Sequence, residues 1–252
     1  MTIYSCAPNW EAMLTCIYIA RMSGIGHKNL QLMVEPLEQI SFLDDYIHVE
    51  PDSALAEKVI EAITRKISPG FYASLAYCSA AYEPETLDTI YRVMLLGFAY
   101  GPQALDMLQY REVMRFQQIS RRVGREICGF REFTRFHSMP GGAYIAHIEP
   151  KSRIVTALAP HFSDRMPSEH WMIADDIHRE VIVHPKDSPF FLWNPTEEEF
   201  SDLLVSEAAN DDYTDLWRAF FDSIAIKERA NARCQRNLFP EWMRKHAVEF
   251  IH

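Results

Sequence analysis

The stretch "YIAHIEPKSRIVTALAPHFSDRMPSEHWMIAD", residues 144–175, places a helix-length segment between two short β-prone runs. In the first run Tyr144, Ala146 and Ile148 alternate with their neighbours, as in a strand with one packed face. "FREFTRF" before this stretch and "EVIVHP" after it are also β-prone, and "SMPGG" suits a hairpin turn. The sequence therefore predicts about four antiparallel strands between residues 130 and 184, with a helix within "SRIVTALAPHFSDRM".

The segments on either side of this region favour helices. "NWEAMLTCIYIARMSG" predicts a helix capped by Asn9, "DSALAEKVIEAITRKISPG" an amphipathic helix that Pro69 stops, and "PETLDTIYRVMLLGFAYG" a third. A long final helix is expected from Asp211 or Asp212 to about residue 238. We therefore expect one compact α+β protein over 1–252, mainly helical in 1–129, with a small antiparallel sheet and C-terminal helices in 130–252.

Length and composition indicate a globular protein. The chain has 252 residues, of which 48% are hydrophobic, so it can bury a sizeable core. Its apolar runs are shorter than the roughly 20 residues that a membrane-spanning helix needs. The N-terminus lacks the basic and apolar segments of a secretion signal. We expect a soluble, cytoplasmic protein with no membrane partner.

The cysteines give no ligand pattern. There are five of them, widely scattered and without a C-x-x-C pair: Cys6, Cys16, Cys78, Cys128 and Cys234. This spacing argues against a disulfide framework, a zinc knuckle and an iron–sulfur cluster held by this chain alone. We expect no bound metal and no cofactor, and we interpret each cysteine as a small core residue.

Basic residues gather locally in a chain of net charge −10. Residues 109–135 hold seven arginines against three glutamates, and the C-terminal segment 217–252 is also basic. At helical spacing, two sets of arginines each share one face opposite an apolar face. The first stripe is Arg111, Arg115, Arg122 and Arg125, with Arg131 and Arg135 just beyond it, and the second is Arg218, Arg229, Arg233 and Arg236.

Arginine forks suit bidentate contact with phosphate, so both stripes are candidate nucleic-acid-binding surfaces. Three other interpretations stay open. The arginines can be solvated surface residues, they can pair with the acidic segment 136–216 inside the molecule, or they can face an acidic protein partner.

The segment "LAPHFSDRMPSEHW", residues 158–171, has two interpretations. In the first, a helix ends near Phe162 and Trp171 begins the next strand. In the second, His161 and Arg165 face a phosphate or base, Glu169 accepts a proton and Trp171 offers a stacking surface. A metal pair of His137 and His147 depends on a strand register that the sequence does not set.

One further position concerns the final helix. Asn231 falls on the apolar side of the predicted helix, which favours a buried, hydrogen-bonded amide over a catalytic one.

Three segments carry a family resemblance: "IYSCAPNWEAMLTCIYIA", "FREFTRFHSMPGGAYIAHIEP" with "ALAPHFSDRMPSEHWMIAD", and "YTDLWRAFFDSIAIKERANARCQRNLFPEWMRKH". Together they resemble the bacterial DUF4130-domain family of DNA metabolism proteins, over essentially the whole chain. The resemblance implies DNA and a radical SAM DNA repair or modification protein as partners. Some relatives are fused to a uracil-DNA-glycosylase-like domain, which implies such a protein as a further partner. This chain lacks that extension, so base excision is not carried over, and neither are any catalytic residues.

The expected function is an accessory or DNA-binding component of a bacterial DNA repair or modification system. One alternative is an enzyme acting on a nucleotide or nucleic acid around His161, Arg165 and Glu169. The other is an adaptor that binds only protein.

Overall fold

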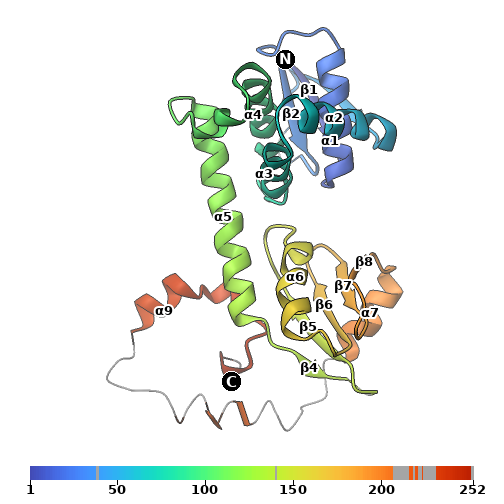
Figure 1. The fold of residues 1–252 in the computed structure, drawn as a ribbon, viewed down its shortest axis with the longest axis vertical. Helices are drawn as coiled ribbons and strands as arrows, with labels where there is room; N and C mark the ends of the chain where they lie inside the picture. Colours follow the sequence, from blue (N-terminus) through green and yellow to red (C-terminus); the bar gives the residue numbers. More distant parts are fainter. Residues whose placement is uncertain are drawn as a thin grey trace. The chain divides into compact units, whose positions relative to one another are not determined.

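The computed structural model describes residues 1–37, 40–139, 141–206, 216–217, 219–220, 223 and 231–250. The chain divides into two compact units, Met1–Val123 and Gly124–His252. The boundary falls within the long helix α5, Arg111–Phe133, so each unit contains part of it (Figure 1). The fold is α+β, as expected.

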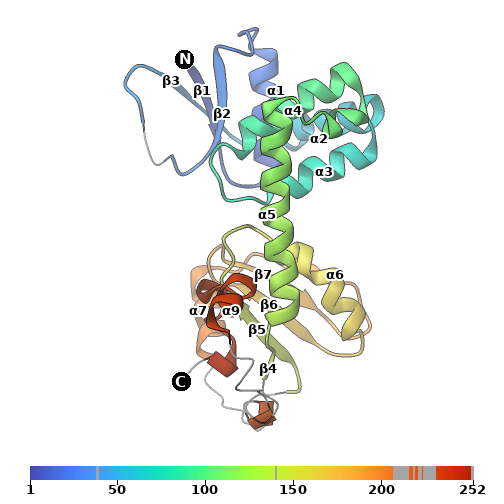
Figure 2. The same cartoon turned by 90° about the vertical axis from the view of Figure 1, so that its left-hand side faces the viewer.

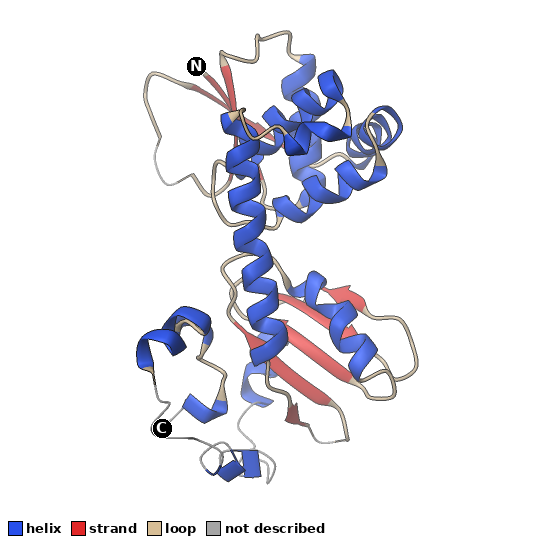
Figure 3. Ribbon diagram, turned by 60° about the vertical axis from the view of Figure 1, so that its left-hand side comes forward, coloured by secondary structure: helices blue, strands red, loops and turns tan. Residues whose placement is uncertain are grey.

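A three-stranded parallel sheet lies in the first unit. Its order is β2-β1-β3, with β1 (Thr2–Cys6) between β2 (Leu30–Val34) and β3 (Asp45–Val49). Figure 3 shows these strands in red beside the helices. The prediction that residues 1–129 are mainly helical does not include these three strands. Apolar runs of about five residues do not by themselves distinguish a strand from a piece of helix.

Helices make up the rest of this unit. The predicted cap is confirmed, since the Asn9 side chain accepts a hydrogen bond of 2.8 Å from the Ala12 backbone N–H. Pro69 does not only stop the preceding helix but also occupies the first position of the next one, where a missing N–H costs nothing. The helical elements before α5 are α1 (Trp10–Met22), α2 (Ser53–Lys66), α3 (Pro69–Ser79), α4 (Thr86–Tyr100) and the short 3-10 helix η1 (Pro102–Asp106).

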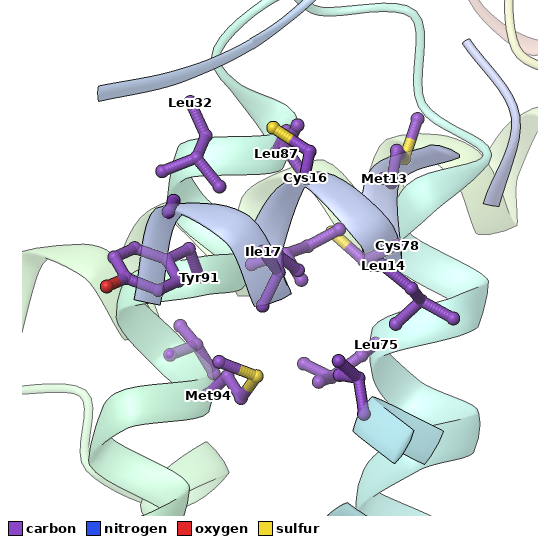
Figure 4. Close-up of a cluster of buried hydrophobic side chains, with 14 of the residues drawn as sticks. Met13, Leu14, Cys16, Ile17, Leu32, Leu75, Cys78, Leu87, Tyr91 and Met94 are labelled. Carbon is purple, nitrogen blue, oxygen red and sulfur yellow. The ribbon is translucent and has the colours of Figure 1, made fainter. Parts of the chain in front are cut away.

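The core of the first unit joins α1, α3, α4 and the sheet (Figure 4). Cys6, Cys16 and Cys78 are buried in it, which confirms their interpretation as core residues. Burial raises the pKa of Cys78 to about 12. The interpretation is wrong for Cys128 and Cys234, which are exposed.

The second unit is built on a five-stranded mixed sheet of order β4-β5-β6-β7-β8. Three neighbouring pairs are antiparallel, whereas β5 and β6 are parallel. The strands are β4 (His137–Ser138), β5 (Tyr144–Ile148), β6 (Trp171–Asp175), β7 (Glu180–His184) and β8 (Phe191–Trp193).

The predicted sheet therefore needs two corrections. It is not purely antiparallel, because helix α6 (Val155–Arg165) carries the chain from the end of β5 back to the start of β6, and parallel neighbours need such a long crossover. "FREFTRF" is not a strand, because most of it completes α5. His137 lies opposite Ile145 in the register, so the sheet does not pair it with His147.

Helices cover both faces of this sheet. Trp171 of β6 meets Phe162 of α6, with ring centroids 6.3 Å apart. On the opposite face of β6, Ala174 packs with Val181 of β7 and with Phe200 of α7 (Glu197–Ser206). Because successive strand residues point to opposite faces, α6 and α7 lie on opposite sides of the sheet (Figures 1 and 2).

The C-terminal segment contains the helix α9 (Ala232–Leu238) and the 3-10 helices η3 (Glu241–Met243) and η4 (Val248–Phe250). Most of the predicted long final helix lies outside the described residues. Asn231 is an extended, exposed N-cap whose side chain accepts from the Cys234 N–H at 3.0 Å. The helix therefore begins after Asn231, and the buried-amide interpretation of this residue is wrong.

In the described part of the chain, no helix is long and apolar enough to cross a membrane.

Gly97 is expected to hold α4 close to its neighbours. A Cβ atom added there would lie 2.9 Å from Ile67 Cδ1 and would also collide with the buried ring of Phe71. We expect Gly97→Ala to lower the free energy of unfolding by about 1–3 kcal/mol, measured by urea denaturation. Gly70→Ala is the matched control, because a Cβ at this helical glycine meets nothing within 4 Å. Equal stability of the two variants would contradict this account.

Candidate functional site

The first arginine stripe is partly neutralised inside its own unit. Arg115 pairs with Glu85, and Arg122 Nη2 lies 2.5 Å from Glu83 Oε1. The Glu83 side chain is only 9% exposed, so removing Arg122 would leave a nearly buried carboxylate unpaired. These two arginines are therefore paired inside the molecule, but the predicted source of the carboxylates is wrong. Their partners come from the segment before α4 and not from 136–216.

A pocket of about 630 Å³ lies beside this stripe, but its charges balance. Three arginines line it together with three carboxylates: Arg92, Arg111, Arg115, Glu85, Asp88 and Glu112. Arg92 also pairs with Asp88 at 3.2 Å. Such a lining gives no net attraction for an anion.

The other stripe residues are placed as follows. Arg111 and Arg125 are exposed, and neither has an ion-pair partner among the residues that the structure describes. Arg233 and Arg236 are exposed on α9, whereas Arg218 and Arg229 lie outside the described residues. The second stripe is therefore not established as one face.

A more basic pocket, also of about 630 Å³, lies within the second unit. His161 and Arg165 are four residues apart on α6, so they share one face of that helix. They meet Arg131, near the end of α5, and Arg135, which follows α5. We call this the α6 pocket, and its lining is Cys128, Arg131, Glu132, Thr134, Arg135, Phe136, His161, Phe162, Arg165 and Met166.

The three arginines of the α6 pocket are held differently. Arg131 Nη2 donates to the Ala157 carbonyl at 3.1 Å. Arg135 Nη2 pairs with Glu249 Oε1 at 2.7 Å, and its guanidinium lies over the Trp217 ring at 5.2 Å. Arg165 is exposed and has no ion-pair partner within the described ranges.

The charge of the α6 pocket is therefore positive. Its described lining opposes three guanidinium groups with a single carboxylate, Glu132. One of the three, Arg135, is paired with Glu249, but Arg131 and Arg165 keep their charge for an incoming anion.

His161 adds a titratable ring to the lining of the α6 pocket. Its Nε2 is buried and has no hydrogen-bond partner in the described part of the chain. Burial lowers the pKa of His161, and the positive charges of Arg131 and Arg165 lower it further. A bound anion would oppose this effect, because a negative charge favours the imidazolium form.

The structure separates the other residues of the 158–171 hypothesis from this pocket. Glu169 is exposed and does not line it, and its backbone carbonyl accepts from His184 at 3.1 Å. Trp171 starts β6, as expected, but is only 1% exposed and stacks on His184 with centroids 4.7 Å apart. Trp171 therefore cannot stack on a base in this conformation, and its assignment as a stacking surface is wrong.

A second cluster in the same unit was not found from the sequence. Glu149, Asp176 and His246 bring three potential metal-ligand atoms within 4.8 Å of one another. They are far apart in the chain, so no motif spacing marks them. The one sequence feature that could indicate the cluster is that Glu149 and Asp176 each directly follow a strand. It brings the two residues together only if those strands are parallel, which the sequence does not show.

The fold and the α6 pocket define an α+β protein with a basic site in its second unit. Comparison with protein families identifies it further: DUF4130, a domain of unknown function, matches residues 84–249, so the chain belongs to this family. The match begins just before α4 and includes the whole sheet of the second unit, while the parallel sheet of the first unit precedes it. A comparison with curated proteins finds no match.

The low pKa of His161 predicts a pH-dependent response to anions. Because folding lowers this pKa, the ligand-free protein loses stability as the pH falls through the unfolded value of about 6.5. Bound sulfate should favour protonated His161 and reverse this loss. We expect sulfate to raise the thermal unfolding midpoint more at about pH 6 than at about pH 8.

His161→Gln tests the assignment, because glutamine keeps a polar side chain that does not titrate. The extra stabilisation at low pH should disappear in this variant. If the variant keeps the wild-type difference between the two pH values, His161 is not the responding group.

Proposed function

We propose that this protein is a DNA-binding accessory component of a bacterial DNA repair or modification system. In this proposal the α6 pocket binds a backbone phosphate. The observation that carries it is that Arg131, Arg135, Arg165 and His161 line one pocket, and that His161 Nε2 has no hydrogen-bond partner in the described part of the chain. The family resemblance of the sequence to DNA metabolism proteins directs the choice of DNA among phosphate-bearing ligands.

The chemistry of the α6 pocket suits phosphate. Guanidinium groups bind phosphate oxygens through paired N–H donors, and the imidazole adds a further donor when it is protonated. Its volume of about 630 Å³ is large enough for a nucleotide-sized group. Because the rest of the chain carries excess negative charge, such a localised basic site would select where DNA binds.

The reaction itself is assigned to a partner. A radical SAM enzyme holds its cluster with closely spaced cysteines, and all five cysteines of this chain are free and widely spaced. We propose that this chain places DNA before such an enzyme, or before a uracil-DNA-glycosylase-like protein, in the cytoplasm. Free thiols fit a reducing compartment.

The alternative of an enzyme in its own right is less well supported. It requires His161, Arg165 and Glu169 to act together, with Glu169 as the proton acceptor, and Glu169 does not line the α6 pocket. The protein-only adaptor remains as the outcome that a failure to bind DNA would favour.

The proposal predicts the salt dependence of DNA binding. Each phosphate contact that is lost should flatten the plot of log affinity against log salt by about 0.9 for duplex or 0.7 for single-stranded DNA. The double variant Arg131→Ala with Arg165→Ala removes the contact with this one phosphate, so it should reduce the slope by about 0.7–0.9, measured by fluorescence anisotropy across a salt series.

Two controls locate the effect. Lys186→Ala removes an exposed cation of the same unit that does not line the α6 pocket, and it should leave the slope unchanged. Arg111→Ala with Arg125→Ala removes the two first-stripe arginines that have no ion-pair partner among the described residues. If only this last variant changes the slope, DNA binds at the first arginine stripe and not at the α6 pocket. If the wild type shows no salt-dependent DNA binding, the proposal is rejected.

A further inference from the structure

The parallel pair β5 and β6 brings two carboxylates to one edge of the sheet. Ile148 and Asp175 are register partners at the carboxyl ends of these strands. The next residue in each chain segment is Glu149 or Asp176, so both acidic side chains begin at the same edge. Carboxyl ends of neighbouring parallel strands are a common place for ligand sites in sheets with helices on both faces.

His246, from the C-terminal segment after η3, completes the cluster. Its Nε2 lies 3.4 Å from Glu149 Oε1 and 3.5 Å from Asp176 Oδ2. Both separations are longer than the 2.7–3.2 Å of ordinary N–H···O hydrogen bonds. A tetrahedral ion with bonds of about 2.0–2.2 Å would separate its ligand atoms by roughly 3.3–3.6 Å, which agrees with these two distances.

The remaining carboxylate oxygens are held by other side chains. Asp176 Oδ1 lies 2.9 Å from His147 Nδ1, and Glu149 Oε2 pairs with Lys245. Glu149 and Asp176 are therefore oriented so that their free oxygens, Oε1 and Oδ2, both approach His246 Nε2. Partners of this kind orient the ligands in metal sites.

His147 adds an independent observation. Its side chain is fully buried, and its Nε2 has no hydrogen-bond partner within the described ranges. The rings of His147 and His246 are close, with centroids 6.0 Å apart. A buried nitrogen without a partner is costly, and water bound to a nearby ion is a donor of the kind that it lacks.

We infer that Glu149, Asp176 and His246 bind a divalent transition-metal ion, of which Zn²⁺ and Mn²⁺ fit this set of two carboxylates and one imidazole. The three side chains are 20%, 13% and 22% exposed, so solvent or a ligand can reach a further coordination position. The expectation of a metal-free protein rested on the cysteines, and their spacing does not bear on ligands of this type.

The competing explanation is that the same residues only form ion pairs that dock the C-terminal segment on the sheet. The two explanations differ in the role of Lys245. In a metal site, the Lys245 ammonium group binds the Glu149 oxygen that does not face the ion, and its positive charge repels the ion. In a docking cluster, its attraction to Glu149 helps to hold the C-terminal segment on the sheet.

The test is zinc and manganese binding to the full-length chain after removal of metals with EDTA. Isothermal titration calorimetry measures affinity, and elemental analysis after gel filtration measures the metal content per chain. We expect one Zn²⁺ or Mn²⁺ per chain in the wild type. Glu149→Gln, Asp176→Asn and His246→Gln should each abolish stoichiometric binding, while circular dichroism checks that they fold.

Three further variants separate the explanations. Glu180→Gln changes a sheet carboxylate that pairs with Arg153 and should bind metal like the wild type. Lys245→Gln should keep or strengthen binding, and His147→Gln should weaken it by roughly 10–100-fold. Absence of stoichiometric Zn²⁺ and Mn²⁺ from the wild type, or unchanged affinity in Asp176→Asn, would overturn the inference in favour of docking ion pairs.

Discussion

The crossover through α6 is the constraint on which the second unit depends. An α-helix between β5 and β6 lets the two strands run in the same direction. The strands then end at one edge of the sheet, where Glu149 and Asp176 follow them. Helix α6 runs the opposite way, so its C-terminal turn carries His161 and Arg165 toward the other edge. One connection thus creates an acidic end and a basic end in the same small sheet.

Pairing of charges decides which arginines are free to act. Along α5, Arg115 and Arg122 are neutralised by Glu85 and Glu83, whereas Arg131 faces a pocket whose described lining holds a single carboxylate. Helical periodicity puts residues on a common face but says nothing of the carboxylates that approach it from elsewhere in the fold. The basic site therefore lies beyond the stripe that periodicity indicates.

The sequence is most informative where the determining interactions are local. The Asn9 cap, the α6 helix and the start of β6 at Trp171 are all predicted correctly, because each depends on residues within a turn or two. The parallel sheet of the first unit and the direction of β5 relative to β6 depend on distant pairing, and short apolar runs do not specify it. The same limit applies to function. The sequence points to His161 and Arg165 because they lie in one short segment, while Glu149, Asp176 and His246 meet only in the folded chain.

The central claim is that the α6 pocket is the place where this protein holds a nucleic-acid phosphate. The most direct measurement is a crystal structure of the chain with a short brominated single-stranded DNA, whose anomalous signal locates the strand. The account predicts a backbone phosphate within hydrogen-bond distance of Arg131 or Arg165, in the pocket that His161 lines. A strand bound along Arg111 and Arg125 instead, with the α6 pocket empty, would contradict it.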